Sequence, residues 1–463
     1  MKTECTAEQL EFHGLDRRVV VGEFDGGKIS SDSGGLLLRE VEHRTHILKR
    51  LANCFTDHRD ADQMEHSLES LIKQRVMGLA LGYEDLNDHD SLRHDPLLAL
   101  LSDVIDPTGQ DRRRAQDKGC ALAGKSTLNR LELTPLDADT RSRYKKIVAD
   151  PAAMDALLVD LFVEAYEQPP DQIILDVDAT DDPLHGYQEG RFFHGYYDHY
   201  CYLPLYVFCG RHLLVSYLRP SNIDPAQHSW AILSLLVKAL RQQWPQVEII
   251  FRGDSGFCRW RMLRWCERHQ VRYIVGIAQN NRLKKQAALW LERSQDLFNS
   301  SGRSQRLFAS MHYAARSWDK PRRVVVKAEH NRLGSNPRFV VTNLTQTDKY
   351  LYDKLYCARG DMENRIKDQQ LGLFAHRASS HRWWNNQFRQ LLSGLAYVLF
   401  EGLRRLSLHD TALEKASPQT LRLALLKIGA VIIRNTRRIK IMMSSACPYQ
   451  DLFRTVALRL NTS

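Results

Sequence analysis

The feature that most constrains the fold is a pair of short apolar runs that each end in an acidic residue. Residues 173–178 read Ile-Ile-Leu-Asp-Val-Asp, and residues 247–254 read Val-Glu-Ile-Ile-Phe-Arg-Gly-Asp. Runs of this length, rich in β-branched residues and bounded by turn residues, predict buried β-strands. Strand interiors disfavour Asp, and an ionised carboxylate in a core requires a partner or a cation. Acids at two such strand ends therefore predict a functional site.

Strand patterns also surround these two runs. They occur at residues 202–208, 213–218, 273–277, 323–327 and 338–342. The first three strands in the chain follow one another directly, which predicts an antiparallel meander, whereas helical patterns at 225–244 and 259–268 separate the later ones. Strands that alternate with helices predict that the sheet continues in parallel. We therefore predict an α/β catalytic domain at about 166–400, with a long, partly β insertion at about 278–343.

The flanking regions read as mainly helical. Apolar residues at helical spacing around 68–79 predict a mainly helical N-terminal region, residues 1–165. Within it, the basic strings at 111–114 and 125–130 predict DNA contacts, and a surface loop and an amphipathic helix explain them equally well. Residues 401–463 are predicted to form a C-terminal helical region.

The charge of the chain favours a polyanionic partner. The formal net charge is +10, and residues 301–340 hold nine Lys or Arg against two acids. A stretch of this kind is either a solvated basic face or a contact for nucleic acid phosphates. In it, Arg322 and Arg323 are candidate DNA contacts. Trp318 is either a simple packing residue or a ring that stacks on an unpaired base.

Other features argue against secretion and membrane insertion. The nine cysteines are scattered singly without a Cys-x-x-Cys pair, a pattern typical of reduced thiols. Residues 1–6 lack a basic stretch followed by an apolar one, so we expect no secretory signal. No apolar run approaches the roughly 18 to 20 residues that cross a bilayer. These observations predict a cytoplasmic protein with no membrane partner.

A third candidate acid belongs to a predicted helix after the insertion. Arg359, Glu363 and Lys367 are four residues apart and share a helix face, with Tyr356 about one turn earlier. The spacing alone is that of an exposed, salt-bridged helix face. The order of elements is more specific: an Asp on a strand, a second Asp after a later strand, and a helical Glu after an insertion. This order resembles the ribonuclease-H-like core of the DDE transposases of bacterial insertion sequences, in particular the insertion sequence 1380 family.

The resemblance extends over nearly the whole chain and implies a role for individual residues. Asp178, Asp254 and Glu363 match the three catalytic acids, and Tyr356 with Arg359 completes the signature Tyr, two residues, Arg, three residues, Glu. Related families carry a Lys seven positions after this Glu, where this chain has Gln370. The resemblance implies that Lys367, one turn earlier, makes the phosphate contact, and that Tyr356 and Arg359 also contact DNA.

The resemblance also implies a reaction, cofactors and partners. The three acids would hold a pair of Mg²⁺ ions, or Mn²⁺ in their place, with Asp176 as a supporting residue. The activity would be strand cleavage at the terminal inverted repeats of an insertion sequence, followed by strand transfer into double-stranded target DNA. A homodimer is expected because two element ends must be joined, and the site of action would be the bacterial cytoplasm at the nucleoid.

Two other functions remain open at the level of sequence. The string Asp176-Val-Asp178-Ala-Thr180 also matches the Asp-x-Asp-x-Thr motif of haloacid-dehalogenase-like phosphatases, in which the first Asp is a nucleophile. That superfamily favours an apolar residue where this chain has Asp181, and it leaves Glu363 without a role. A catalytically inactive DNA-binding regulator would keep the basic surface but has no need for three placed acids. Only the Asp-x-Thr spacing selects Asp178 over Asp176 as the first metal ligand.

Overall fold

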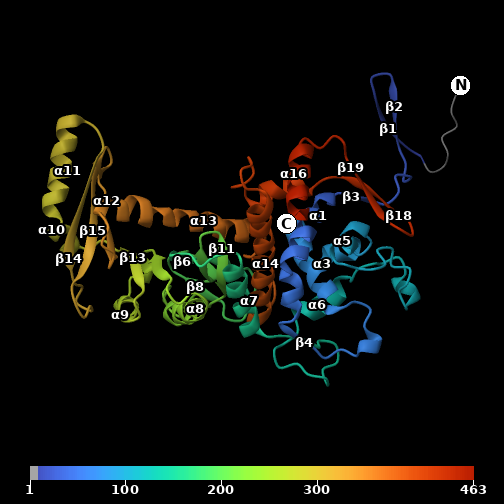
Figure 1. The fold of residues 1–463 in the computed structure, drawn as a ribbon, viewed down its shortest axis with the longest axis horizontal. Coiled ribbons are helices and arrows are strands. Elements are labelled where there is room, and N and C mark those ends of the chain that lie inside the picture. The colour runs from blue at the N-terminus through green and yellow to red at the C-terminus, as the bar shows by residue number, and fades with distance from the viewer. Residues whose placement is uncertain (1–8, 463) are drawn as a thin grey trace. The chain divides into compact units, whose positions relative to one another are not determined.

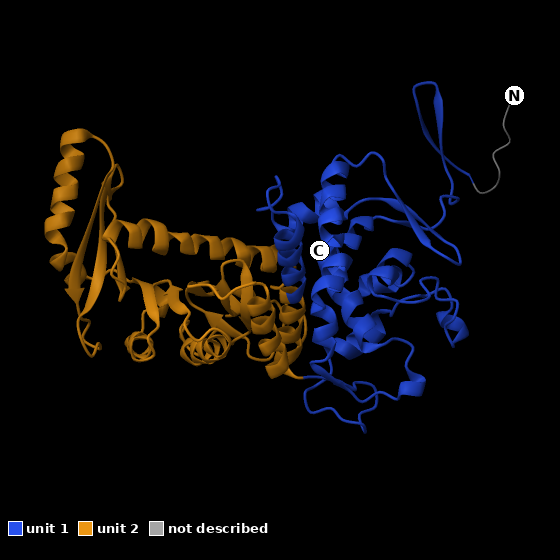
Figure 2. Ribbon diagram, in the orientation of Figure 1, with its two compact units in different colours: residues 1–149, 395–463 blue, residues 150–394 orange. Residues whose placement is uncertain are grey.

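The computed structural model describes residues 9–462, so the first residues, from which the absence of a secretory signal is predicted, lie outside the described part. The chain divides into two compact units (Figure 2). One comprises Met1–Ala149 with Leu395–Ser463, and the other is Asp150–Gly394. The expected boundaries lie near residues 165 and 400, and the structural ones lie at 149 and 394. The two terminal segments, which the sequence treats separately, share one unit.

The unit of residues 150–394 is built on a nine-stranded mixed sheet (Figure 1). In spatial order its strands are β11 (His212–Tyr217), β10 (Leu205–Cys209), β6 (Gln172–Ala179), β12 (Glu248–Gly253), β13 (Arg272–Ile277), β17 (Arg338–Thr342), β15 (Arg322–Asn331) and β14 (Gln305–Tyr313), with β16 (Gly334–Ser335) beside β15. Strands β6, β12 and β13 are parallel, and the other neighbours are antiparallel. The predicted α/β class, meander and parallel continuation are confirmed.

The predicted strand at 202–208 is wrong in one respect, because the chain breaks there into two strands. The first part belongs to a small sheet in the order β7 (Asp182–Pro183), β9 (His199–Tyr202), β8 (Phe192–His194), and the second part is β10. Pro204 stands between them. Proline has no N–H for a strand ladder, so it interrupts the pairing at this point.

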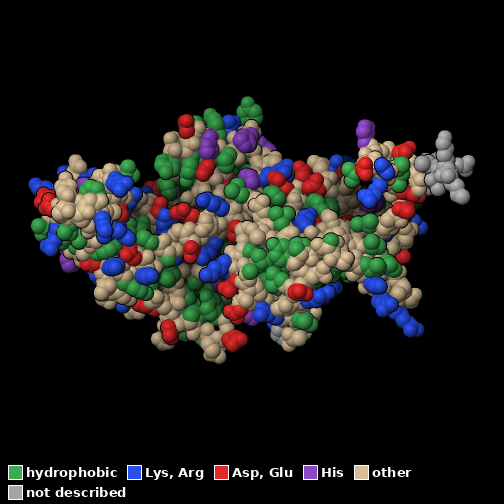
Figure 3. Space-filling model, turned by 90° about the horizontal axis from the view of Figure 1, so that it is seen from above, with side chains coloured by type: hydrophobic (Ala, Val, Ile, Leu, Met, Phe, Trp, Pro, Cys, Tyr) green, Lys and Arg blue, Asp and Glu red, His purple; other side chains and the backbone are tan. Residues whose placement is uncertain are grey.

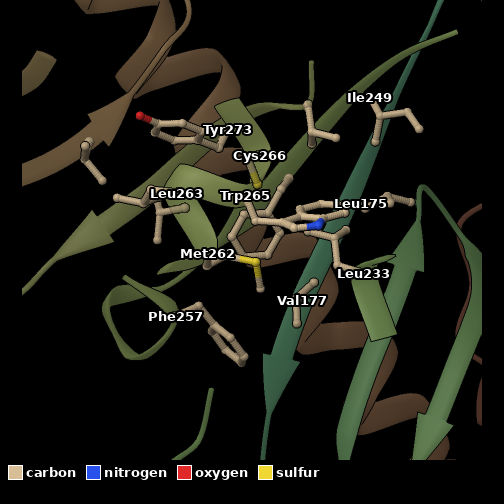
Figure 4. Close-up of a cluster of buried hydrophobic side chains, with 14 of the residues drawn as sticks. Leu175, Val177, Leu233, Ile249, Phe257, Met262, Leu263, Trp265, Cys266 and Tyr273 are labelled. Atoms are coloured by element: carbon tan, nitrogen blue, oxygen red, sulfur yellow. The ribbon is translucent and has the colours of Figure 1, made fainter. Parts of the chain in front are cut away.

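The two faces of the large sheet carry different side chains. Along β6, Leu175 and Val177 enter an apolar core that also holds Leu233 of α8 (Ser229–Gln243) and Trp265 of α9 (Trp260–Arg268), as Figure 4 shows. Helix α7 (Pro151–Glu164) contributes to the same core. Because side chains alternate along a strand, Ile174 and the acids at 176 and 178 lie on the opposite face. There Ile174 packs with the apolar residues of a helical run described next.

That helical run extends without interruption from residue 348 to 372. It consists of α12 (Asp348–Tyr350), the π-helical η6 (Leu351–Tyr356), the 3₁₀ turn η7 (Cys357–Arg359), α13 (Gly360–Lys367) and the π-helical η8 (Asp368–Gly372). Apolar side chains of η6 pack on β12, β13, β15 and β17. π-helical turns are rare in proteins, and those that occur are often located at functional sites. The run is followed by the long helix α14 (Trp383–Ser407).

The predicted insertion enlarges the sheet. Its helices α10 (Asn281–Gln286) and α11 (Ala288–Ser301) precede β14, and β17 returns the chain to β13. Figure 1 shows α11 beside β14 and β15, and the two pairs are in contact. The insertion is therefore partly β, as predicted, and its strands belong to the same sheet as the acids.

The unit that joins the chain ends contains more β-structure than predicted. Its helices are α1 (Leu36–Thr45), α2 (Ile47–Ala52), α3 (Leu68–Leu81), α4 (His89–Leu92), α5 (Pro96–Leu101), α6 (Lys125–Glu132), α15 (Pro418–Leu421) and α16 (Gln450–Asn461). Between them are the 3₁₀ turns η1 (Ser33–Gly35), η2 (Ala61–Gln63), η3 (Leu86–Asp88) and η4 (Ala115–Asp117) and the π-helical η9 (Arg422–Leu426). Ser67 caps α3 by accepting a hydrogen bond from the Ser70 amide, and Gly82, at φ +100°, ends it.

Short strands accompany these helices in the unit. They are β1 (Leu10–Leu15), β2 (Arg18–Gly22), β3 (Ile29–Ser30), β4 (Phe55–Asp57), β5 (Ile147–Ala149), β18 (Ala430–Arg434) and β19 (Ile439–Met443). β18 and β19 form a hairpin that pairs with β3. The β-branched side chains of 431–433 favour a strand over a helix. Between residues 9 and 462, no helix combines the length and apolar character needed to cross a bilayer.

Candidate active site

Asp178 lies at the carboxyl end of β6, on the face covered by the helical run. Its side chain is 14% exposed. One carboxylate oxygen accepts a hydrogen bond from the Ala179 amide at 2.9 Å, and the other accepts one from Arg359 Nη1 at 3.1 Å. The guanidinium of Arg359 also donates through Nη2 to Glu363 Oε1 at 3.0 Å. Arg359 therefore bridges two of the predicted acids.

Asp254 follows the neighbouring parallel strand β12. It caps the short turn η5 (Ser255–Phe257), where its Oδ1 accepts a hydrogen bond from the Gly256 amide at 2.8 Å. Because β6 and β12 are parallel neighbours, their carboxyl ends lie at the same edge of the sheet, where open α/β sheets place their ligands. Asp254 thus has a local capping role and also stands beside Asp178.

The charges around Asp178 act on its pKa. Burial is the main cause that raises the pKa of Asp178 to about 7. The Arg359 guanidinium lowers this pKa, and the negative charges of Asp254 and Glu363 raise it. The Arg359 bridge and the parallel pairing of β6 with β12 place Asp178, Asp254 and Glu363, which are far apart in sequence, in one part of the fold. Their combined negative charge exceeds what Arg359 neutralises.

Asp176 has a different environment from Asp178. It is 1% exposed and accepts two hydrogen bonds from Arg252, one of them Nη2 to Oδ2 at 2.7 Å. Arg252 and Asp176 lie opposite each other on the neighbouring strands β12 and β6, and Arg252 also donates to the Leu355 carbonyl. Arg252 was missed by sequence reasoning, although an Arg inside an apolar strand is a signal that could have found it.

The buried ion pair of Asp176 also bears on the phosphatase alternative. In the Asp-x-Asp-x-Thr motif, the first Asp must be free to attack substrate. Here both oxygens of Asp176 are engaged by Arg252 beneath the helical run. This geometry does not favour Asp176 as a nucleophile.

Tyr356 lies against the loop that carries Asp254. A Cβ atom at Gly276 would stand 2.5 Å from the Tyr356 hydroxyl oxygen and 3.0 Å from the Ser255 amide nitrogen. Burial is the main cause that raises the pKa of Tyr356, with a contribution from Asp254. Gly276 was also missed by sequence reasoning. The absence of a side chain there allows the tyrosine and the turn to approach each other.

Lys367 and Gln370 lie further along the same helical run. Lys367 is exposed and, within residues 9–462, forms no ion pair. Gln370 donates through Nε2 to the Asp181 carbonyl at 3.0 Å and to Asp182 Oδ1 at 2.7 Å. Gln370 therefore holds the segment after β6, whereas Lys367 leaves its ammonium available.

The structure does not bring the candidates from the insertion to the acids. Arg322 is buried and paired with Glu267 and Asp319, and Arg323 is paired with Asp348. Trp318 packs edge to face against Tyr313, with ring centroids 5.6 Å apart, and Arg322 lies over its ring. The proposed DNA contacts of these residues stay predictions, and the packing interpretation accounts for the position of Trp318. Figure 3 shows other Lys and Arg side chains on the surface at the left of the view, where Figure 1 places the insertion.

The donor chemistry of the acid cluster suits a hard cation. Three carboxylates supply only oxygen ligands, which Mg²⁺ and Mn²⁺ prefer. As the side chains lie, no group of three or more His, Cys, Asp or Glu residues in the described part of the chain is placed to hold a metal ion together. Arg359 occupies the position between Asp178 and Glu363. A cation shared by these two acids would therefore take the place of the Arg359 guanidinium.

The acids gather at the carboxyl ends of neighbouring parallel strands, where α/β sheets place their active sites. The model of the family described as "Transposase DDE domain group 1" matches residues 12–463. The chain therefore belongs to this family and is a DDE-type transposase, a protein of DNA transposition.

Solved structures are also similar to this chain. No curated protein matches the sequence. Among solved structures, the chain is similar to a piggyBac transposase in a synaptic complex with hairpin DNA, determined by cryo-electron microscopy. The two share 12% identity, the similarity covers 86% of this chain and 80% of the other, and the TM-score is 0.42.

Proposed function

We propose that this transposase cuts DNA strands at the ends of an insertion sequence and transfers them into target DNA, with Asp178, Asp254 and Glu363 as its catalytic acids. The observation that carries the proposal is the shared position of these acids: Arg359 bridges Asp178 to Glu363, and Asp254 follows the strand that runs parallel to the strand of Asp178. They come from a strand, the turn after the adjacent strand, and a helix more than 100 residues later. Family membership supplies the class of reaction.

The proposal includes a ribonuclease-H-like catalytic core. The strands β11, β10, β6, β12 and β13 are neighbours in this order, with three antiparallel strands of a meander followed by two strands parallel to the first. Helix α8 precedes β12, and α9 connects β12 to β13. This arrangement is the one that the family resemblance implies. It supports the assignment of Asp178 to the first strand of the core and of Asp254 to the fourth.

Asp178, Asp254 and Glu363 would hold the metal, and Asp176 would support the strand beside them. A pair of Mg²⁺ ions in such a site stabilises the attacking and leaving oxygens of an in-line displacement at phosphorus. Other side chains of the site would bind and orient the DNA strand. Arg359, which now neutralises two acids, would turn its planar guanidinium to the phosphate, for which bidentate contacts suit it.

Other residues would position the DNA strand. The exposed ammonium of Lys367 would contact a phosphate one helical turn beyond Glu363. Tyr356, held between Gly276 and the Asp254 turn, would orient the scissile strand. The N-terminal region would add contacts to the terminal inverted repeats. Because two element ends must be joined, we propose that a homodimer acts, in the bacterial cytoplasm at the nucleoid.

Strand cleavage by the full chain tests this proposal. The substrate is a duplex with the terminal inverted repeat, incubated with Mg²⁺, with Mn²⁺ and with EDTA. We expect Asp178→Asn, Asp254→Asn and Glu363→Gln to bind the duplex but to lose nicking by at least about a hundredfold, as happens when a group that acts on transition-state charge is removed. EDTA should also stop nicking by the wild type.

A matched control comes from the same helix as Glu363. Asp361 lies two residues away, its side chain is 72% exposed, and it contacts Arg365 instead of the cluster. Asp361→Asn should nick DNA like the wild type. If all three acid variants cut normally, or if the wild type releases phosphate only from small esters, the proposed catalytic role of the acids is wrong.

A further inference from the structure

The β8–β9 hairpin presents an aromatic ring to solvent at its tip. Tyr196 lies in the turn between the two strands and is 85% exposed. The turn is closed by a hydrogen bond from the Asp198 amide to the His194 carbonyl at 2.9 Å, and Asp198 adopts a positive φ of 58°. This turn fixes the backbone position of Tyr196 at the tip of the hairpin. The burial of apolar core area does not account for such a ring.

The hairpin tip lies beside the acid cluster. The rings of Tyr196 and Tyr197 meet edge to face, with centroids 5.0 Å apart. The ring of Tyr197 in turn lies beside that of His199, with centroids 6.1 Å apart. His199, on β9, contacts Asp181 through Nε2 at 2.8 Å. A DNA strand whose phosphate reaches Asp178 would therefore pass the exposed ring of Tyr196.

The same hairpin carries a guanidinium whose charge is not neutralised by an acid. Arg191 lies over the ring of Tyr200, 3.7 Å from its centroid, and near the ring of Tyr187 at 5.4 Å. Within residues 9–462, Arg191 forms no ion pair. Stacking on tyrosine holds the side chain while leaving its positive charge for a phosphate. Aromatic faces with a neighbouring positive charge are the features that bind unpaired nucleotides.

We propose that the β8–β9 hairpin binds an unpaired base of the DNA end, which stacks on Tyr196 while Arg191 contacts a phosphate of the same strand. The proposal rests on the proposed function, because that function brings DNA to the carboxylates. Stacking at this point would keep the base next to the cleavage position out of the duplex. The strand would then bend toward Asp178 with its phosphate exposed.

Equilibrium binding of the full chain to forked DNA tests this proposal. The probe is a terminal-repeat duplex with a few unpaired nucleotides at the cleavage position, one of them 2-aminopurine, and the reference is the fully paired duplex. EDTA is present so that no cleavage occurs. Because stacking on one aromatic ring is worth enough to change affinity on the order of tenfold, the wild type should prefer the fork by about that factor. The 2-aminopurine fluorescence should fall on binding.

Three variants separate stacking from other contacts. Tyr196→Phe keeps the ring and should behave like the wild type, whereas Tyr196→Ala should lose both the preference for the fork and the quenching. Arg191→Gln should weaken binding to both probes and reduce its salt dependence. If Tyr196→Ala keeps the preference and the quenching, the stacking proposal is overturned. If the wild type stacks the base but does not nick DNA with Mg²⁺, the proposed function fails while the stacking site stands.

Discussion

Replacing Arg252 by Met should destabilise the unit of residues 150–394 more than most single substitutions. Arg252 is 6% exposed, and its bidentate partner Asp176 is 1% exposed. Met keeps much of the apolar stem but leaves a carboxylate buried without its cation. Removing one member of such a pair costs about 3–5 kcal/mol. For a unit of this size each kcal/mol lowers the midpoint of thermal unfolding by about 2–4 °C, so we expect a decrease of roughly 6–20 °C.

Thermal unfolding followed by circular dichroism, with hydrogen exchange to assign the transition to this unit, measures the effect. The double variant Asp176→Leu with Arg252→Met removes both charges, and it should recover most of the lost stability because no isolated charge stays buried. Arg252→Met should also reduce nicking, since Arg252 holds the Leu355 carbonyl next to Tyr356. An unchanged midpoint for Arg252→Met would refute the reasoning, as would a double variant less stable than the single one.

Three further predictions concern the site and its surroundings. Gly276→Ala should cost about 1–3 kcal/mol of stability, as overpacking does, and adding Tyr356→Phe should restore part of it in denaturant melts, because the phenylalanine lacks the oxygen that the new Cβ would meet. Burial raises the pKa of Asp182 to about 7, so the folded chain holds a proton that the unfolded chain releases above about pH 4. The stability of the wild type should therefore fall as pH rises from about 4 to 7. Asp182→Asn still accepts the hydrogen bond from Gln370 and should become steadily more stable relative to the wild type over that range. A difference in melting temperature that does not change with pH would contradict this prediction. Arg359→Lys should nick DNA about tenfold more slowly at unchanged DNA affinity, because one ammonium cannot form the two parallel contacts of a guanidinium. Nicking assays measure the rate and gel shifts the affinity; equal nicking rates for Arg359→Lys and the wild type would contradict this role of the guanidinium.

Local sequence patterns were sufficient to predict much of the sheet. The strands that became β6, β12, β13, β15 and β17 were predicted within a few residues, because β-branched runs bounded by turn residues express a local preference. The helix that carries Glu363 was also predicted. Its π-helical neighbours were not, since they depend on how the run packs against the sheet. The hairpin of β18 and β19 was missed for a similar reason, because it pairs with β3, in which Ser30 lies opposite Ala430.

For the site, the sequence by itself determined which acids are candidates, because Asp178 and Asp254 stand at the ends of predicted strands and Glu363 completes the family signature with Tyr356 and Arg359. Their grouping follows from parallel pairing of β6 and β12 and from the return of the helical run across the sheet. Only the tertiary structure decided that Asp176 is neutralised by Arg252 while Asp178 faces the other acids. The alternation of side chains along β6 places Asp176 and Asp178 on one face of the sheet. The partner of each carboxylate depends on the register between strands, and Arg252 is 76 residues from Asp176, so local sequence preferences carry no information about this pairing.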